Sequence, residues 1–313
     1  MNRPNANFER VVIIKRMTTL EELIVRFNTK PQARFYLEQA GEDFSRIESL
    51  HAGQETMLTM VRQAIPRQLK QQMIERDLLP QFHFEHSDLI IVVGQDGLVV
   101  NTAKYLDGQA ILAINPLPDI YDGVLLPFDQ QTFAKALEDA LAGNRSTRSI
   151  TFAEARMDDG QSLLGFNDLF IGAASHVSAR YRLIHNGEEE FQSSSGIIIS
   201  TGAGSTGWLK SVYTGAFGVV NALGGQQAFD PDLLRFDWDS PFLVYSVREP
   251  FPSKISGTSL LYGVITEEQP LELVSEMSEN GVIFSDGVQQ DNLSFNIGSK
   301  ATICIADKKA NMY

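Results

Sequence analysis

The stretch "SDLIIVVGQDGLVV", Ser87 to Val100, decides the fold of this 313-residue chain. Its apolar run has the length and composition of a buried strand, and the residues that follow it predict a tight turn into a helix. Open α/β sheets bind their ligands at the carboxyl ends of the strands, where such a turn lies. Gly94, Asp96 and Gly97 therefore form a candidate site.

Two interpretations of this turn are open. Glycines can expose backbone N–H groups to an anion, and Asp96 is the acid in the turn that could take a proton from a substrate hydroxyl. Alternatively, the Asp96 side chain caps the helix that follows. Isolated glycine-rich turns are weak signals, and the pattern favours neither interpretation.

The first half of the chain alternates strands and helices. Arg10 to Arg16 has strand composition, and Thr18 with Glu21 has the spacing of a capping box at the start of a helix. A Gln-rich segment from Gly53 to Asp77 is expected to be helical, bent or broken near Pro66.

A second apolar run, "AILAIN", ends at Asn115, and an amphipathic helix is expected from Phe128 to Asn144. Strand, helix and strand at this spacing imply a right-handed parallel crossover. Residues 1–145 are therefore predicted to form an α/β nucleotide-binding domain with a parallel sheet.

The second half consists of short runs of β-branched and aromatic residues. "HNGE" and "ENGV" each contain the Asn-Gly pair that favours a type I′ hairpin. A helical insertion is expected from about Gly207 to Leu234. Residues 146–313 are therefore predicted to form a mainly antiparallel β domain, with a C-terminal segment that can pack back on the first domain.

The composition excludes several classes of protein. The formal net charge is −13, and such a chain lacks the clustered Lys and Arg on which nucleic-acid binding depends. The longest apolar runs are strand-sized, far below the roughly 20 residues of a spanning helix. A single cysteine, Cys304, fits a reducing compartment, and the first residues lack a secretory pattern. We expect a cytoplasmic protein with no nucleic-acid or membrane partner.

The stretch "STGAGSTGW", Ser200 to Trp208, directly follows the apolar run "GIII". Small hydroxyl residues and glycines at a strand end can surround a polar, planar ligand closely. The alternative is a plain Gly-Ser loop, although linkers of such composition rarely run from a core strand into a helix that begins with an aromatic residue.

The stretch "GFNDLFIG" places Asn167 and Asp168 side by side in an otherwise apolar strand. Buried polar side chains are unfavourable unless they are paired, so these two either brace a turn or reach the hydroxyls of a ligand. His83 and His86 lack a third metal ligand nearby, and no protein metal site is predicted.

These stretches, in this order, resemble the NAD kinase family, whose members phosphorylate the adenosine ribose of NAD. "VVGQDGLVVNTAKYL" is similar to the family's Gly-Gly-Asp-Gly-Thr segment, "STGAGSTGW" to its Thr-Gly-Ser-Thr-Ala-Tyr segment and "GFNDLFIG" to its Asn-Glu segment. "FSDG" is similar to a late Asp-Gly turn of the family. "AINPLPDIYDGVLLP" and "YSVREP" look closest to the branch that includes the mitochondrial-type enzymes of animals and bacterial relatives. The similarity runs from about Arg10 to Asp307.

The resemblance implies an α/β domain and a β-rich domain with the active site between them, a homodimer, and ATP and Mg²⁺ as cofactors. It implies that Asp96 accepts the proton of the 2′-hydroxyl of the adenosine ribose of NAD while ATP donates the phosphoryl group, giving NADP. Phosphoryl transfer needs mostly in-line positioning and charge neutralisation. The residues implied to bind the two nucleotides are Gly94, Gln95, Gly97, Asn167, Asp168, Thr201, Gly204, Ser205 and Thr206.

Three residues depart from the family's pattern. Gln95 stands where the family has a second glycine, Leu98 where it has threonine, and Asp168 where it has glutamate. A side chain at position 95 could crowd the phosphates of the donor, and Leu98 offers no hydroxyl. The alternatives are therefore a slow or non-catalytic dinucleotide-binding homologue, or a kinase of the same superfamily that acts on a lipid or sugar hydroxyl.

Overall fold

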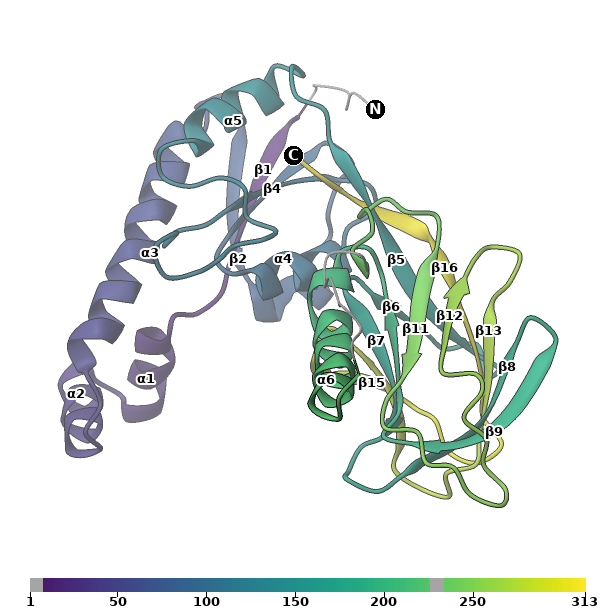
Figure 1. Ribbon diagram of the computed structural model, residues 1–313. Helices are drawn as coiled ribbons and strands as arrows, with labels where there is room; N and C mark the ends of the chain where they lie inside the picture. Colours follow the sequence, from purple (N-terminus) through teal and green to yellow (C-terminus); the bar gives the residue numbers. More distant parts are fainter. Residues whose placement is uncertain (1–7, 226–233) are drawn as a thin grey trace. The chain divides into compact units, whose positions relative to one another are not determined.

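The structure is a computed structural model that describes residues 8–225 and 234–313 (Figure 1). The chain forms two compact units, Met1–Arg148 with Ala310–Tyr313, and Ser149–Lys309. Among the described residues, no helix combines the length and the apolar character needed to cross a membrane.

The first unit is built on a parallel sheet with the strand order β2-β1-β3-β4. The last strand of the chain, β16 (Lys300–Met312), ends beside β4, where Asn311 and Met312 pair in parallel with Ala110 and Ile111. The predicted parallel sheet is confirmed. Its other strands are β1 (Arg10–Lys15), β2 (Lys70–Glu75), β3 (Asp88–Val93) and β4 (Ala110–Ile114).

The first helix of this unit begins where the sequence predicts. The capping box of Thr18 and Glu21 opens the first helix, and Pro31 lies in the first turn of the second. Two further helices, α3 and α5, pack against the sheet through a shared apolar core that includes Leu58, Val61 and Leu137 (Figure 1). The helices are α1 (Thr19–Phe27), α2 (Lys30–Gln39), α3 (Phe44–Ala64), α4 (Asp96–Ala103) and α5 (Phe133–Leu141), with a 3₁₀ helix η1 (Arg76–Gln81).

Two predictions for this unit were wrong in their bounds. Lys70–Glu75, expected to be helical, is strand β2, and its polar residues suit it because it lies at the edge of the sheet with most of its side chains exposed. The helix expected from Phe128 begins at Phe133, because Phe128 forms a β-bridge with Ile114 before the chain turns into α5.

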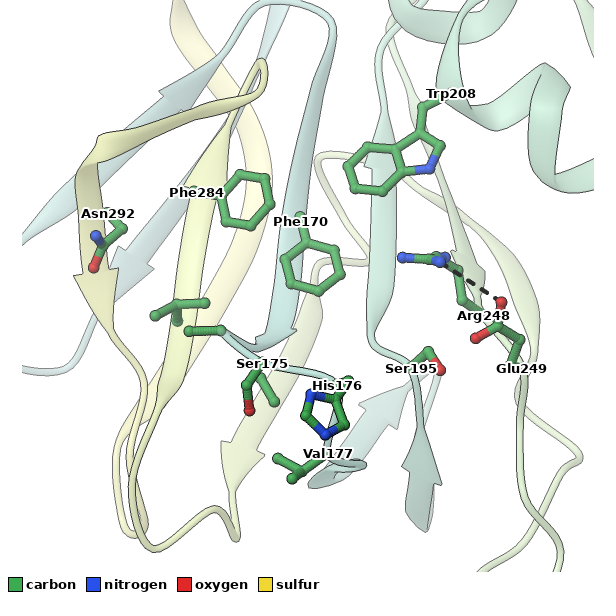
Figure 2. A pocket seen from close by; sticks show the side chains of 13 residues that line it. Phe170, Ser175, His176, Val177, Ser195, Trp208, Arg248, Glu249, Phe284 and Asn292 are labelled. Carbon is green, nitrogen blue, oxygen red and sulfur yellow. Dashed lines mark ion pairs between the residues drawn. The ribbon is translucent and has the colours of Figure 1, made fainter.

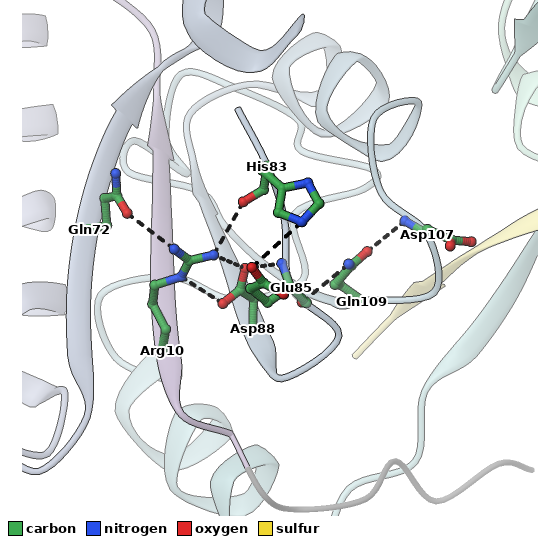
Figure 3. A network of polar contacts seen from close by, with 7 residues as sticks. All are labelled: Arg10, Gln72, His83, Glu85, Asp88, Asp107 and Gln109. Carbon is green, nitrogen blue, oxygen red and sulfur yellow. Dashed lines mark hydrogen bonds and ion pairs between the residues drawn. The ribbon is translucent and has the colours of Figure 1, made fainter. Parts of the chain in front are cut away.

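A partly buried ion pair joins the neighbouring strands β1 and β3. Arg10 donates through Nε and Nη2 to the two carboxylate oxygens of Asp88, at 2.7 and 2.6 Å, and Asp88 is almost fully buried (Figure 3). The same carboxylate accepts a hydrogen bond from the backbone N–H of Glu85 at 2.8 Å. The pair therefore fixes the segment that enters β3.

The second unit consists mainly of antiparallel strands, as predicted, and they form a sandwich of two sheets. One sheet has the order β12-β11-β10-β7-β14-β15, and the other contains β16, β13, β8 and β9 with β5 and β6 alongside. Side chains from both sheets, such as Ile171, Tyr181 and Ile199, form one apolar core. The strands are β5 (Arg148–Met157), β6 (Ser162–Gly165), β7 (Asp168–Ala173), β8 (Ala179–His185), β9 (Glu188–Ser194), β10 (Ile197–Ser200), β11 (Leu243–Val247), β12 (Tyr262–Ile265), β13 (Leu271–Ser275), β14 (Gly281–Ser285) and β15 (Val288–Ser294).

Only one of the two Asn-Gly pairs forms a hairpin turn. Asn186 and Gly187 both have positive φ, 54° and 80°, and join β8 to β9. Gly281 instead begins β14, which lies in a different sheet from β13, so the second predicted hairpin was wrong. A side chain at Gly281 would collide with the carbonyl oxygen of Phe295, which explains the glycine there.

The predicted helical insertion is α6 (Trp208–Ala222), which follows the short 3₁₀ helix η2 (Gly204–Thr206). The part of that prediction that covers residues 226–233 lies outside the described residues. The helix places Trp208 directly after the glycine-rich stretch that follows β10.

Candidate active site

Asp96 lies at the carboxyl end of β3, as the first residue of α4. The position before the helix, the N-cap, is occupied by Gln95, whose side chain makes no capping hydrogen bond. The helix-cap interpretation of Asp96 therefore does not describe this turn. Gln95 and Gly97 are exposed and Asp96 is half-buried, so the turn is open to a ligand.

The carboxylate of Asp96 binds the backbone of a loop further along the chain. It accepts hydrogen bonds from the backbone N–H of Leu125 at 2.8 Å and of Val124 at 3.2 Å. The same loop is held by Asn115, whose Nδ2 donates to the carbonyl of Tyr121 at 2.8 Å. These bonds orient the carboxylate and leave further lone pairs of its oxygens for a substrate hydroxyl.

The two unusual residues of the turn differ in their surroundings. Gln95 has φ −109° and ψ 165°, which any residue adopts, so it introduces no backbone strain. Leu98 is buried, and a side-chain carbon at Gly94 would lie 2.9 Å from its Cδ2. Position 98 therefore faces the packed interior, whereas the exposed Gln95 side chain is the one that a ligand at the turn would meet.

Asn167 and Asp168 lie at the corner between β6 and β7. The carboxylate of Asp286 accepts hydrogen bonds from three consecutive backbone N–H groups, those of Phe166 at 3.1 Å, Asn167 at 2.7 Å and Asp168 at 3.3 Å. In return, the backbone N–H of Asp286 donates to the carbonyl of Asp168 at 3.1 Å. Asp286 was not among the site residues predicted from the sequence, although "FSDG" contains it.

The glycine-rich stretch after β10, Ser200 to Trp208, binds the backbone carbonyls of the same corner. The Thr201 hydroxyl donates to the carbonyl of Phe166 at 2.6 Å, and the backbone N–H of Thr201 donates to that of Asn167 at 3.0 Å. Gly204 has no room for a side chain, because a Cβ would collide with the carbonyl of Asn167. The Ser205 hydroxyl donates to the carbonyl of Gly202 at 2.7 Å.

The structure thus brings together Asn167, Asp168, Thr201 and Gly204. Thr201 and Ser205 are buried and use their hydroxyls to hold backbone carbonyls. Thr201 supports the corner, and Ser205 supports the glycine-rich stretch itself. Thr206 is half-buried at the end of η2.

A cavity of about 540 Å³ lies in the second unit, lined by residues that the sequence analysis did not select (Figure 2). Phe170 faces it from β7, two residues after Asp168, and stacks on Phe284 and Trp208 with ring centroids 4.7 and 5.7 Å away. The guanidinium of Arg248 lies 5.4 Å from the centre of the Trp208 ring. The alternation along β7, which puts residues 168 and 170 on one face, was the signal for this cavity.

The residues that the structure describes contain no group of three or more His, Cys, Asp or Glu side chains placed to hold a metal ion. Mg²⁺ usually binds proteins through one or two carboxylates and the phosphates of its nucleotide.

Solved structures of two kinases share this architecture. Yeast NADH kinase, solved with NADH, aligns with a TM-score of 0.58 over 98% of this chain and 83% of its own, at 15% sequence identity. An NAD kinase from Archaeoglobus fulgidus, solved with ATP, gives a TM-score of 0.55 over 97% and 93%, at 17% identity. The chain has the NAD kinase fold.

The sequence also resembles NAD kinases directly. The NAD kinase of Chlorobaculum tepidum is 28% identical over 130 residues, which are 41% of this chain and 45% of the relative. The NAD kinase of Ralstonia nicotianae is 31% identical over 146 residues, 43% of this chain and 46% of the relative. The matches span about half the length of these curated relatives. No protein-family model matches the chain.

Proposed function

We propose that this protein is an NAD kinase, which transfers a phosphoryl group from ATP to the 2′-hydroxyl of the adenosine ribose of NAD and so forms NADP. The proposal depends on the position of the Asp96 carboxylate. Its carboxylate stands at the carboxyl end of a parallel strand, oriented by two backbone N–H groups, in a chain with the NAD kinase fold. Ligands of open α/β sheets bind at this end of the strands.

Asp96 would accept the proton of the 2′-hydroxyl as the hydroxyl oxygen attacks the terminal phosphorus of ATP, and ADP would leave. Gln95 and Gly97, which are exposed at this turn, offer backbone N–H groups to the donor's phosphates, whereas Gly94 is buried and its N–H donates to the Ile114 carbonyl at 3.2 Å. Mg²⁺, held mainly by those phosphates, supplies charge neutralisation when it is bound. The task of the chain's own residues is to position the hydroxyl and to take its proton.

Asn167 and Asp168 would bind the ribose hydroxyls of NAD, because an amide and a carboxylate can both accept hydrogen bonds from a diol. Thr201 and Gly204 support that corner, Ser205 supports the glycine-rich stretch, and Thr206 follows in the same stretch. The neighbouring cavity, with the Phe170 and Trp208 rings, offers an apolar surface to a planar ring of the dinucleotide. We further propose a homodimer, as the resemblance implies, in a reducing compartment such as the cytoplasm, which the single cysteine fits. Light scattering tests the oligomeric state.

A second candidate function, a non-catalytic dinucleotide-binding protein, is favoured by one observation. The exposed Gln95 side chain stands at the turn where a glycine would let the backbone approach the phosphates. Such a protein would keep the corner between β6 and β7, where Asn167 and Asp168 lie, and would bind NAD without transferring phosphate.

The deciding experiment incubates the purified protein with NAD or NADH, ATP and MgCl₂, and measures phosphorylated dinucleotide by mass spectrometry. Product that disappears without ATP and in the Asp96→Asn variant supports the kinase. Stabilisation of the protein by NAD without product supports the binding protein. The absence of both product and stabilisation would refute both functions.

A further inference from the structure

The carboxylate of Asp286, which was not among the predicted site residues, binds the backbone of the proposed ribose-binding residues Asn167 and Asp168. Asp286 accepts from the backbone N–H groups of Phe166, Asn167 and Asp168, although about 120 residues separate it from them in the sequence. Hydrogen bonds to an ionised acceptor are roughly twice as strong as neutral ones. The three amides are therefore fixed together by a single side chain.

The position of Asp286 in the chain does not itself require a carboxylate. Asp286 and Gly287, with φ 54° and 70°, form the two-residue turn between β14 and β15. Asn-Gly suits such a turn as well as Asp-Gly does. The turn therefore explains a small polar residue at position 286, and the three N–H groups that donate to it favour a carboxylate there.

We propose that Asp286 is a positioning residue, which orients Asn167 and Asp168 toward the ribose hydroxyls of the dinucleotide by holding their peptide groups. Thr201 holds the carbonyl side of the same peptides, so the corner is fixed from both directions. Rotation of either peptide would redirect both side chains, and a displacement of about 1 Å in a binding group is enough to impair it. This inference rests on the proposed function, because it assigns the ribose to that corner.

The test replaces Asp286 with asparagine, which keeps the turn but removes the charge. Glu190→Gln is the matched control, because Glu190 also accepts hydrogen bonds from distant backbone N–H groups, those of Ser259 at 2.9 Å and Leu260 at 3.2 Å. For Asp286→Asn we expect the KM for NAD to rise about 10-fold, while kcat and the KM for ATP stay within about twofold. Glu190→Gln should leave all three constants unchanged.

Hydrogen exchange of the backbone amides provides a readout that needs no ligand. Exchange at residues 166–168 should accelerate in Asp286→Asn and stay unchanged in Glu190→Gln. An unchanged KM for NAD, an equal rise in both variants, or unchanged exchange at residues 166–168 overturns the proposal. If the wild-type protein binds neither NAD nor NADH, the proposed function fails instead, and accelerated exchange would still show that Asp286 holds the corner.

Discussion

At the scale of single residues, Asp96 combines a proposed chemical role with a visible structural one. Asp96→Asn should keep the fold and the affinity for NAD, because asparagine still accepts a hydrogen bond from the Leu125 N–H. Turnover should fall by about 10² to 10⁴-fold, the usual contribution of a positioned base. Steady-state kinetics with a thermal unfolding curve measure both effects.

The control for this prediction loosens the same loop without touching the carboxylate. Asn115→Ala removes the hydrogen bond to the Tyr121 carbonyl. If Asp96 only anchored the loop, Asn115→Ala would lower turnover as much as Asp96→Asn does. Unaltered turnover in a folded Asp96→Asn protein would also contradict the assignment of Asp96 as the base.

Gln95 allows a prediction about the donor. Gln95→Gly should lower the KM for ATP, because it removes an exposed side chain from the turn that we propose binds the phosphates. The change relieves no strain, since φ is −109°, and the fold should be kept, because glycine is among the residues preferred at the N-cap. Initial rates across ATP concentrations measure the effect. An unchanged or higher KM in the folded variant would mean that Gln95 serves another donor or ligand.

At the scale of secondary-structure elements, the sequence predicted the elements that have a regular local pattern and missed the strand at the edge of the sheet. The apolar run of β3 and the capping box of α1 identified their elements because period and spacing are local properties. Strand β2 was missed because a strand at the sheet edge needs few apolar residues. Likewise, the turn itself predicts Asp96 as a site residue, but the bonds of Asp96 to Val124 and Leu125 depend on a loop that only the folded chain brings near.

The packing of β8 against β11 makes stability depend on pH. His185 is buried, and its ring meets that of Tyr245 edge-on with centroids 5.2 Å apart. Burial lowers the pKa of the His185 imidazole below its usual value. In the unfolded chain this imidazole gains a proton near pH 6.5, so acidification through about pH 6.5 favours unfolding.

We therefore expect the free energy of unfolding to fall between about pH 7 and pH 5.5 in the wild-type protein, and to fall less in His185→Gln. His83→Gln is the control for the loss of a histidine at an exposed position, since the His83 side chain is 86% exposed. Urea unfolding at several pH values measures how the free energy of unfolding changes with pH. Equal slopes in the wild-type protein and His185→Gln would show that His185 does not contribute.

At the scale of the whole molecule, the chain leaves the first unit at Arg148 and returns to it for its last four residues. These residues complete the first unit's sheet. The Tyr313 N–H donates to the Ile111 carbonyl at 3.0 Å, and the Asn311 side chain donates to the Gly108 carbonyl at 3.0 Å. The Tyr313 ring belongs to the core that α3 and α5 share with the sheet. The α/β and antiparallel halves were predictable from the change of pattern near residue 145, since each half has its own periodicity.

Deleting residues 310–313 should therefore destabilise the first unit selectively. The deletion removes the buried side chains of Ala310, Met312 and Tyr313 and leaves β4 without its neighbour at that end. Burial of one large side chain contributes about 1.5–3 kcal/mol, a large part of the stability of a typical domain.

Tyr313→Phe is the control: it keeps the ring and removes a buried hydroxyl that has no hydrogen-bond partner among the described residues, so stability should be maintained. Hydrogen exchange should show faster exchange in β3 and β4 of the deletion protein, with β8 and β13 unchanged. Equal acceleration in all four strands would mean that the two units unfold as one.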